Sequence, residues 1–314
     1  MEEKAFTPDE VAKIFQISKH TVYELIKRGE LRAFKIGNKM RIEQSEIDRF
    51  KESAKAPARK EFDQQDVSPA SGTAPVRLSG SHDFLVEHFV KAASSDLAQQ
   101  ILPTYIGSLE GLMMLYRGQS DIAAVHLLDP SSQEYNLPFI KQLFVYEEIS
   151  VIRFASREQG LLVDKGNPKN IQGFEDLTRK DIQFVNRQKG SGTRFLLDSK
   201  LMSLDISPSN IKGYEIEEWN HLSTASYISS GRADAAFGIR SAAGQLGLDF
   251  IPVAKEQFDL VFRWSQENKK ALSGTLEYLQ SNVFKSSLTN PEGYDITELG
   301  NIIYQTTNTE VSSI

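Results

Sequence analysis

In the first part of the chain, apolar residues recur among polar ones at the spacing of a helix. Thr7-Pro8-Asp9-Glu10 has the form of a capping box, with a hydroxyl N-cap, proline at the first helical position and glutamate three residues after the cap. Apolar residues then recur at helical spacing as far as Phe15. A second helix is expected from Ser18, another N-cap, to Gly29, a C-terminal stop residue. Two helices joined by about three residues predict a helix-turn-helix.

The pattern changes to strict alternation directly after this pair. LRAFKIGNKMRI (31–42) holds two short alternating runs around Gly37-Asn38, which is a hairpin signal. Ser45 is expected to cap a last helix that reaches Phe50. The hairpin would be a basic β-wing beside the helix-turn-helix.

The rest of the chain follows a different pattern. Residues 54–74 are rich in Pro, Ala, Ser and Gly and predict a flexible linker. Beyond it, helical patterns alternate with β-rich apolar runs at 76–80, 121–127, 148–156, 182–187, 235–239 and 259–264. This alternation predicts an α/β body with a largely parallel sheet. The expected domains are therefore 1–54, a linker at 55–75, and a body at 76–306.

Composition narrows the class of protein. The 314 residues include no cysteine, so disulfides, thiolate-bound zinc and cysteine nucleophiles are excluded. No apolar run is long enough to span a bilayer, and the acidic start MEEKAFTPDE does not have the form of a secretory signal, so we expect a soluble cytoplasmic protein with no membrane partner. Residues 1–60 contain 14 Lys and Arg against 10 Asp and Glu, whereas the remainder contains 22 against 32. A basic N-terminal region followed by an acidic remainder is typical of a chain with a tethered nucleic-acid-binding module.

The N-terminal pattern resembles the excisionase-type winged-helix modules of the mercury-resistance regulator superfamily. The match runs from Phe6 to Phe50 and keeps the cap, the helix core, the stop glycine and the wing in register. The resemblance implies that the second helix enters the major groove of DNA and that the wing meets phosphate or minor groove. Thr21 could instead pack between helices, and Tyr23 could be partly buried. The candidate DNA-binding residues are Lys19, His20, Thr21, Tyr23, Lys27, Arg28, Lys39 and Arg41.

Four loops of the body place small and hydroxyl residues where a strand ends and a helix begins. They lie at 79–83, 106–111, 186–194 and 222–225. The N–H groups at a helix N-terminus are unpaired and carry partial positive charge, so converging loops of this type predict an anion site. The third loop, NRQKGSGTR, adds two glycines and an arginine. It lacks the Gly-Lys-Ser/Thr ending of a P-loop, and nucleotide hydrolysis is not supported.

The body resembles the periplasmic-binding-protein-like domains that are fused behind helix-turn-helix modules and are related to molybdate- and tungstate-binding proteins. The match covers about 76–304 and rests mainly on GQSDIAAVH (118–126), NRQKGSGTR (186–194) and SGRADAAFGI (230–239). The resemblance implies a two-lobed type II fold with crossover strands near 150–155 and 258–262. Lobe one would hold about 76–152 and 263–306, lobe two about 156–255, and a ligand would bind between them.

Several candidate ligand residues have an alternative role. Ser81 and Ser108 could be helix caps alone, Arg194 could pair with Asp198 one turn later, and His126 could be a hydrogen-bonded core histidine. The candidates are Ser79, Ser81, His82, Ser108, His126, Arg187, Ser191, Gly192, Thr193, Arg194 and Thr224.

The combined pattern predicts a one-component transcriptional regulator. Its DNA partner would be a double-stranded operator, bound as a homodimer because one small module covers only a half-site. Its effector would be a small oxyanion, by resemblance molybdate or tungstate, with a larger organic anion left open by the polar Ser81-His82-Asp83. No metal or cofactor site is predicted. A molybdenum-cofactor-related enzyme is the first alternative, but we find no nucleophile with an oriented base. A recombination accessory protein is the second, and the long ligand-binding-type body argues against it.

Overall fold

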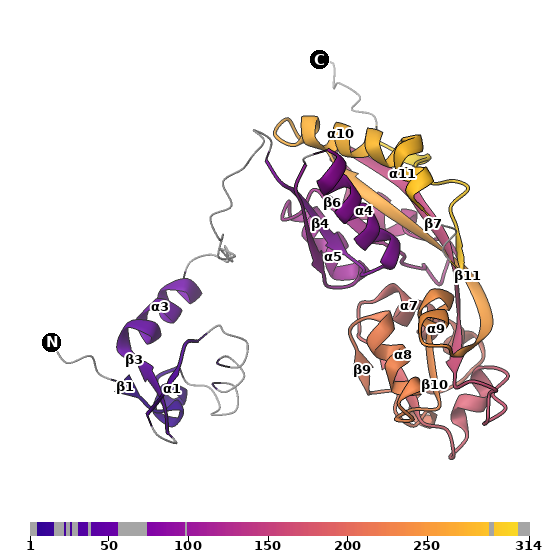
Figure 1. Ribbon diagram of the computed structural model, residues 1–314, viewed down its shortest axis with the longest axis horizontal. Helices are drawn as coiled ribbons and strands as arrows, with labels where there is room; N and C mark the ends of the chain where they lie inside the picture. Colours follow the sequence, from indigo (N-terminus) through magenta and orange to yellow (C-terminus); the bar gives the residue numbers. More distant parts are fainter. Residues whose placement is uncertain are drawn as a thin grey trace. The chain divides into compact units, whose positions relative to one another are not determined.

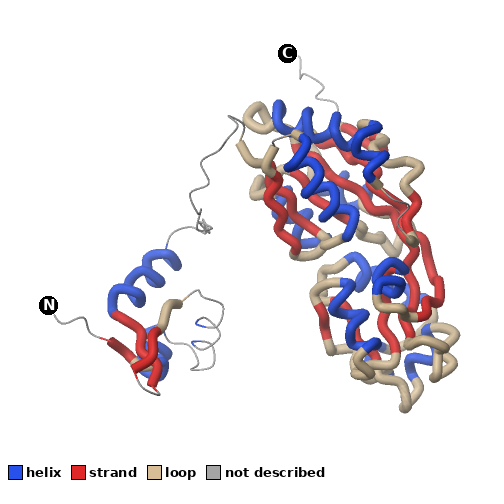
Figure 2. Tube along the Cα trace, viewed as in Figure 1, coloured by secondary structure: helices blue, strands red, loops and turns tan. Residues whose placement is uncertain are grey.

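The computed structural model describes residues 5–15, 22, 26, 31–36, 39–55, 74–97, 99–288 and 292–306. The chain divides into two compact units, 1–68 and 69–314. Each unit is described by itself (Figures 1 and 2). Residues 56–73, most of the expected linker, lie outside the described residues.

The smaller unit is a three-stranded antiparallel sheet with helices. Its elements are β1 (Ala5–Phe6), α1 (Pro8–Phe15), β2 (Phe34–Ile36), β3 (Lys39–Glu43) and α3 (Gln44–Lys55), with strand order β1-β3-β2. The predicted capping box is confirmed, because the amide of Thr7 donates to Glu10 Oε2 at 2.8 Å and the amide of Glu10 donates to Thr7 Oγ1 at 3.3 Å. The core gathers Val11, Ala12, Val22, Leu31, Ile42 and Ile47.

The structure bears on three further expectations for this unit. The wing strands are confirmed, since β2 pairs antiparallel with β3. Gly37-Asn38 and most of the expected second helix lie outside the described residues. The expected cap at Ser45 is wrong, because α3 begins one residue earlier at Gln44. The Ser45 hydroxyl lies 3.5 Å from Glu43 Oε2 instead.

The larger unit has two lobes. Figure 1 shows lobe one in the upper part of the unit and lobe two below it. Lobe one contains β4 (Val76–Gly80), α4 (Phe84–Asp96), β5 (Ile101–Tyr105), α5 (Ser108–Tyr116), β6 (Ile122–Val125), α6 (Leu137–Leu143), α10 (Lys269–Gln280), α11 (Asn282–Ser287) and β13 (Ile302–Gln305). Lobe two contains the short helices η1 (Phe174–Thr178) and η2 (Pro208–Asn210), β8 (Phe184–Arg187), α7 (Gly192–Ser203), β9 (Glu217–Glu218), α8 (His221–Ser229), β10 (Ala235–Ile239) and α9 (Arg240–Gln245).

Two long strands join the lobes. β7 (Ile149–Val163) and β11 (Asp249–Arg263) pair with each other along nearly their whole length, and the short β12 (Tyr294–Asp295) adds to β7. The continuous sheet runs β5-β4-β6-β11-β7-β10-β8-β9. The expectation of a largely parallel sheet needs correction, because β7 and β11 pair antiparallel with each other and with their neighbours. Chains that cross between lobes and return necessarily run in opposite directions, so the sheet is mixed.

Aromatic residues of each lobe pack against the core of the other. Phe84, at the start of α4 in lobe one, packs against the lobe-two cluster that contains Val185 and Ala236. Phe195 of α7 packs against the lobe-one cluster and lies edge-to-face with Phe139, with ring centroids 6.4 Å apart. The lobes are therefore in direct contact. Among the described residues, no helix has the length and apolar character needed to cross a bilayer.

Candidate functional site: the junction of the two lobes

A chain of hydroxyl contacts lies at the lobe-one side of the junction. Ser81 follows β4, and its Oγ lies 2.8 Å from Oγ of Ser108, the first residue of α5. The amide of His126, which follows β6, donates to the same Ser108 Oγ at 3.2 Å. All three residues are buried. Parallel strands that end at one sheet edge therefore bring these predicted residues together.

Lobe two meets this chain with the N-terminus of α7. Gly192 is the first residue of α7, and a Cβ built on it would lie 2.2 Å from the carbonyl oxygen of His126. Only glycine permits this close approach between lobes. Next to it, Thr193 Oγ1 accepts a hydrogen bond from Gln159 Nε2 at 3.1 Å, and the amide of Leu109 donates to the carbonyl of Gly190 at 3.1 Å.

A buried charge network continues from His126 along the crossover strands. His126 Nδ1 lies 2.8 Å from Glu256 Oε2, and Glu256 pairs with the guanidinium of Arg157. Arg157 also donates to Asp83 and stacks over the ring of Phe258 at 4.1 Å. The side chains of Arg157, Asp83 and Glu256 are fully buried. Nine residues are thus linked, and we call them the interlobe cluster: Ser81, Asp83, Ser108, His126, Arg157, Gln159, Gly192, Thr193 and Glu256.

Burial and neighbouring charge set the protonation states in this cluster. Burial raises the pKa of Glu256, but the Arg157 charge and the His126 bond outweigh it and hold the pKa at about 2. Burial lowers the pKa of His126, and the opposing effect of Glu256 is too small to restore it. The cluster therefore contains an ionised Glu256 beside a neutral His126 ring at neutral pH.

Arg187 is a second buried cation, at the end of β8. Its guanidinium donates to the carbonyls of Glu218 and Trp219 and to His221 Nδ1, and among the described residues no carboxylate bonds it. Burial and the charge of Arg157 lower the pKa of Arg187 to about 9, which still leaves it charged at neutral pH. A buried cation without a bonded carboxylate favours an anionic ligand nearby.

Four other predicted ligand residues are occupied by local contacts. Ser79 donates to Gly111 O at 2.9 Å inside the lobe-one core, and His82 Nε2 lies 3.0 Å from Glu87 Oε1. Arg194 bonds Asp198, which was the alternative considered for it, and also Glu217.

Thr224 does not start its helix as the sequence suggested. α8 begins at His221 with Asn220 as N-cap, and Thr224 Oγ1 donates to Asn220 O at 2.8 Å. The proposed site therefore omits Ser79, His82, Arg194 and Thr224. Ser191 directly precedes Gly192 of the cluster, and its Oγ caps α7 by accepting from the amide of Arg194 at 3.2 Å.

Sequence reasoning missed the residues contributed by the crossover strands. Arg157, Gln159 and Glu256 are polar or charged side chains within long strands, and each is buried. Charged residues inside a β-rich run such as EISVIRFASREQG are a usable signal, because such residues are buried only when they are paired.

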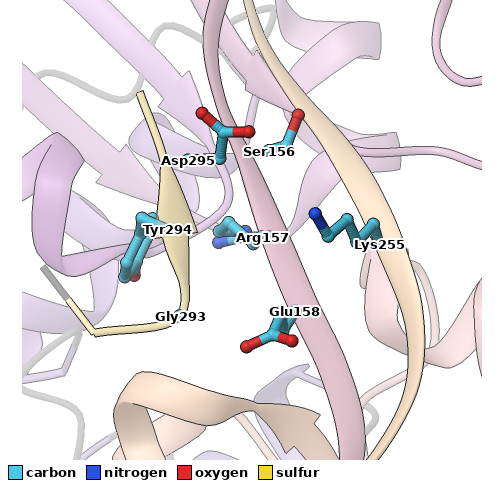
Figure 3. A pocket seen from close by; sticks show the side chains of 7 residues that line it. All are labelled: Ser156, Arg157, Glu158, Lys255, Gly293, Tyr294 and Asp295. Carbon is cyan, nitrogen blue, oxygen red and sulfur yellow. The ribbon is translucent and has the colours of Figure 1, made fainter. Parts of the chain in front are cut away.

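A cavity of about 220 Å³ lies next to Arg157 on the crossover strands (Figure 3). Its walls are Ser156, Arg157, Glu158, Lys255, Gly293, Tyr294 and Asp295. None of the predicted ligand residues lines it, so the candidate site is the interlobe cluster. In the described part of the chain, no group of three or more His, Asp or Glu side chains is arranged to hold a metal ion.

The candidate DNA interface lies largely outside the described residues. Lys19, His20, Thr21, Tyr23, Lys27 and Arg28 are among the residues that the structure does not describe. Lys39 begins β3, and Arg41 lies in the same strand, where its Nη1 donates to the carbonyl of Met40 at 3.0 Å. Arg41 is thus on the wing, as expected.

Family models match both units of the chain. A helix-turn-helix domain matches residues 5–55, and a PBP superfamily domain matches residues 91–280, more than half of the chain. The chain belongs to the PBP superfamily. A PBP domain behind a helix-turn-helix domain suggests a ligand-binding, DNA-binding regulator, and the predicted fold class is confirmed.

The chain is similar to known proteins over different lengths. Uncharacterized protein YvgK of Bacillus subtilis (strain 168) is 38% identical over 312 residues, covering 97% of this chain and 99% of YvgK. A Clostridium pasteurianum protein, described as an uncharacterized protein in the ferredoxin 2Fe-2S gene 5' region, is 38% identical over 109 residues, 34% of this chain and 96% of that protein. A putative phosphate ABC transporter substrate-binding protein with bound phosphate from Clostridium perfringens is 16% identical with a TM-score of 0.50, covering 68% of this chain and 96% of that one. The last likeness concerns the fold alone.

Proposed function

We propose that this PBP superfamily protein is a one-component transcriptional regulator that binds operator DNA through its N-terminal domain and a small oxyanion at the interlobe cluster. The observation that carries the proposed ligand binding is the contact of His126 in lobe one with Gly192, the first residue of α7 in lobe two. The amide of His126 bonds Ser108, whose hydroxyl pairs with that of Ser81. Hydroxyls and helix N-termini bind anions by directional hydrogen bonds without needing a bonded cation. Arg187 adds a buried positive charge.

The ligand would enter when the lobes separate and would hold them together once bound. In the described arrangement Gly192 touches His126, and Phe84 and Phe195 each pack against the opposite lobe. A ligand that bonds donors from both lobes stabilises the closed arrangement relative to the open one. Closure is therefore the two-state element through which binding would reach the DNA-binding domain.

Molybdate and tungstate are the proposed effectors, on the resemblance of the body to proteins that bind them. Neutral donors fixed on a sheet edge select by size, because a longer metal–oxygen bond requires a wider ring of donors. Sulfate is expected to compete poorly against molybdate or tungstate. Phosphate is a useful third probe, since it is tetrahedral and carries a proton at neutral pH.

Calorimetry on the full chain tests the proposed binding of an oxyanion at the interlobe cluster. Molybdate or tungstate should give a binding isotherm, and the Ser81→Ala/Ser108→Ala double variant should weaken it at least tenfold because two donors are lost. The matched control is Ser207→Ala/Ser209→Ala, which removes an exposed hydroxyl pair with the same 2.8 Å separation in lobe two. Absence of binding by molybdate, tungstate and phosphate, in a folded sample, would refute the oxyanion ligand.

The proposed DNA binding by the N-terminal domain is tested in a separate experiment. Duplex fragments selected by the full chain from a random library should bind with a steep salt dependence, because cations between Ser18 and Arg41 displace counterions from phosphates. Lys19→Ala combined with Arg41→Ala should weaken this binding and leave the thermal stability of the larger unit unchanged. Equal binding by the double variant would contradict the assignment.

The regulator is proposed to act as a homodimer in the cytoplasm. One module of about 50 residues reads a single half-site, and two-fold pairing doubles the base contacts. Sedimentation at micromolar concentration, with and without selected DNA, measures this directly. A monomer under both conditions would overturn the dimer.

A further inference from the structure

His126 occupies the centre of the interlobe cluster. Its Nδ1 is bonded to Glu256 of β11, its backbone amide to Ser108 of α5, and its ring lies edge-to-face with Phe258 at 5.5 Å. The Gly192 backbone at the start of α7 leaves no room for a Cβ, which would lie 2.3 Å from His126 Nδ1. The ring is therefore held in one orientation, with 1% of the residue exposed.

The bond to Glu256 fixes which ring nitrogen carries hydrogen. An ionised carboxylate only accepts hydrogen bonds, so Nδ1 must be the donor. In a neutral imidazole the other nitrogen, Nε2, is then a lone-pair acceptor. Among the described residues His126 forms its hydrogen bonds through the backbone amide and Nδ1, and none through Nε2.

Burial lowers the pKa of His126 and keeps the ring neutral until an anion arrives. Among the described residues Glu256 is the carboxylate bonded to the ring, and its charge raises the pKa, while the positive charges of Arg157 on β7 and Arg187 on β8 oppose protonation. Burial lowers the pKa of His221 of α8 well below its usual range, so that ring is also neutral.

Three further charged side chains on the packed elements are bonded to other partners. Asp83, before α4, is bonded to Arg157. On α5, Glu110 lies 3.4 Å from Arg117, and on α7, Arg194 is bonded to Asp198 and Glu217.

A neutral ring of this kind opposes a fully ionised oxyanion. The Nε2 lone pair would face a lone pair on the anion oxygen, and the two repel unless a proton lies between them. A protonated ring donates from both nitrogens, to Glu256 and to the anion, which gives two charge-assisted hydrogen bonds.

We propose that His126 is a specificity-determining residue that couples binding of a fully ionised oxyanion to the uptake of one proton. This inference rests on the proposed function, since it requires an anion at the interlobe cluster. It distinguishes molybdate and tungstate, which are fully ionised at neutral pH, from hydrogenphosphate, which carries its own proton to Nε2. Affinity for molybdate then rises as the pH falls from 8 to 7, by about tenfold per pH unit for one proton.

Calorimetry of the full chain with molybdate, at pH 7.5 in buffers of different ionisation enthalpy, counts the protons taken up. The expected value is close to one, together with the tenfold pH dependence of Kd. His126→Gln should abolish both. His88→Gln is the matched control, because His88 lies on α4 and its Nε2 contacts Ser287 Oγ at 2.8 Å, with no contact to the cluster.

A second variant guards against misfolding of His126→Gln. In Glu256→Gln the amide can donate to Nδ1, which allows hydrogen on Nε2 of a neutral ring, so proton uptake should fall below half while binding persists. Binding of molybdate by the parent protein without proton uptake would overturn the role of His126 and leave the oxyanion sensor standing. Failure of molybdate, tungstate and phosphate to bind at all would overturn the sensor and this inference together.

Discussion

The N-termini of α4 and α7 are capped in chemically different ways at the junction of the two lobes. α4 is capped by the carboxylate of Asp83, which accepts from the amide of Leu85 at 2.8 Å and is also bonded by Arg157. α7 is capped by the neutral hydroxyl of Ser191. The negative charge of the Asp83 cap thus balances the partial positive charge at the N-terminus of α4. The neutral Ser191 cap leaves the corresponding charge of α7 unbalanced. A helix N-terminus preceded by a small polar residue is a candidate anion site only when its cap is neutral and leaves the partial positive charge of the helix unbalanced.

Removing the charged cap should have the largest effect on stability. Asp83→Ala removes the cap and leaves the buried Arg157 paired with one described carboxylate, that of Glu256, which should lower the free energy of unfolding by about 3–5 kcal/mol. Urea unfolding followed by tryptophan fluorescence measures this, because Trp219 and Trp264 both lie in the larger unit.

The variant Asp83→Asn separates the two contributions. Asparagine is a good N-cap, so the helix start is kept and only the charge is lost. We expect its cost to exceed the ~1 kcal/mol typical of a cap, because the remaining loss is that of the ion pair. If Asp83→Asn is as stable as the parent protein, the charge of Asp83 does not balance Arg157.

Blocking the approach of α7 should chiefly affect ligand binding. Gly192→Ala places a Cβ where it would meet the carbonyl of His126 at 2.2 Å, so the lobes cannot close fully. We expect at least a tenfold loss of affinity for molybdate, measured by calorimetry, and a larger radius of gyration by small-angle scattering in the presence of ligand. Gly274→Ala on α10 is the control, since its Cβ meets no atom within 4 Å. Unchanged affinity of Gly192→Ala would contradict closure at this contact.

The fold was predictable wherever a buried strand is a continuous apolar run. The run AAFGI is β10 residue for residue. VRLSG also coincides with β4, although its Arg77 is exposed. The crossover strands were recognised only in part, near 150–155 and 258–262, although each has 15 residues. Their missing portions contain Arg157, Gln159 and Glu256. These polar residues of the interlobe cluster interrupt the apolar pattern.

The site was predictable only to the level of its loops. Ser81 and Ser108 do meet, because parallel strands end at one edge of the sheet. Gly192 meets His126, because a residue without a Cβ permits this contact between lobes. Sequence could not separate Thr224, which bonds its own helix, from Thr193, which faces Gln159. Hydroxyls that cap a helix and hydroxyls that bind a ligand use the same atoms, and only the tertiary contacts distinguish them.

The smallest effect is expected for the neutral cap. Ser191→Ala removes the acceptor for the amide of Arg194 and should cost about 1 kcal/mol in the free energy of unfolding. The Ser191 hydroxyl can also donate its hydrogen to an anion at the start of α7, so we expect a several-fold loss of molybdate affinity by calorimetry. Ser281→Ala is a matched control, because Ser281 caps α11 in lobe one by accepting from the amide of Phe284 at 3.2 Å. It should lose similar stability and no affinity, since α11 contributes no residue to the interlobe cluster. If the two variants bind molybdate equally well, Ser191 is a cap alone, and the anion at α7 must be held by backbone amides and Thr193.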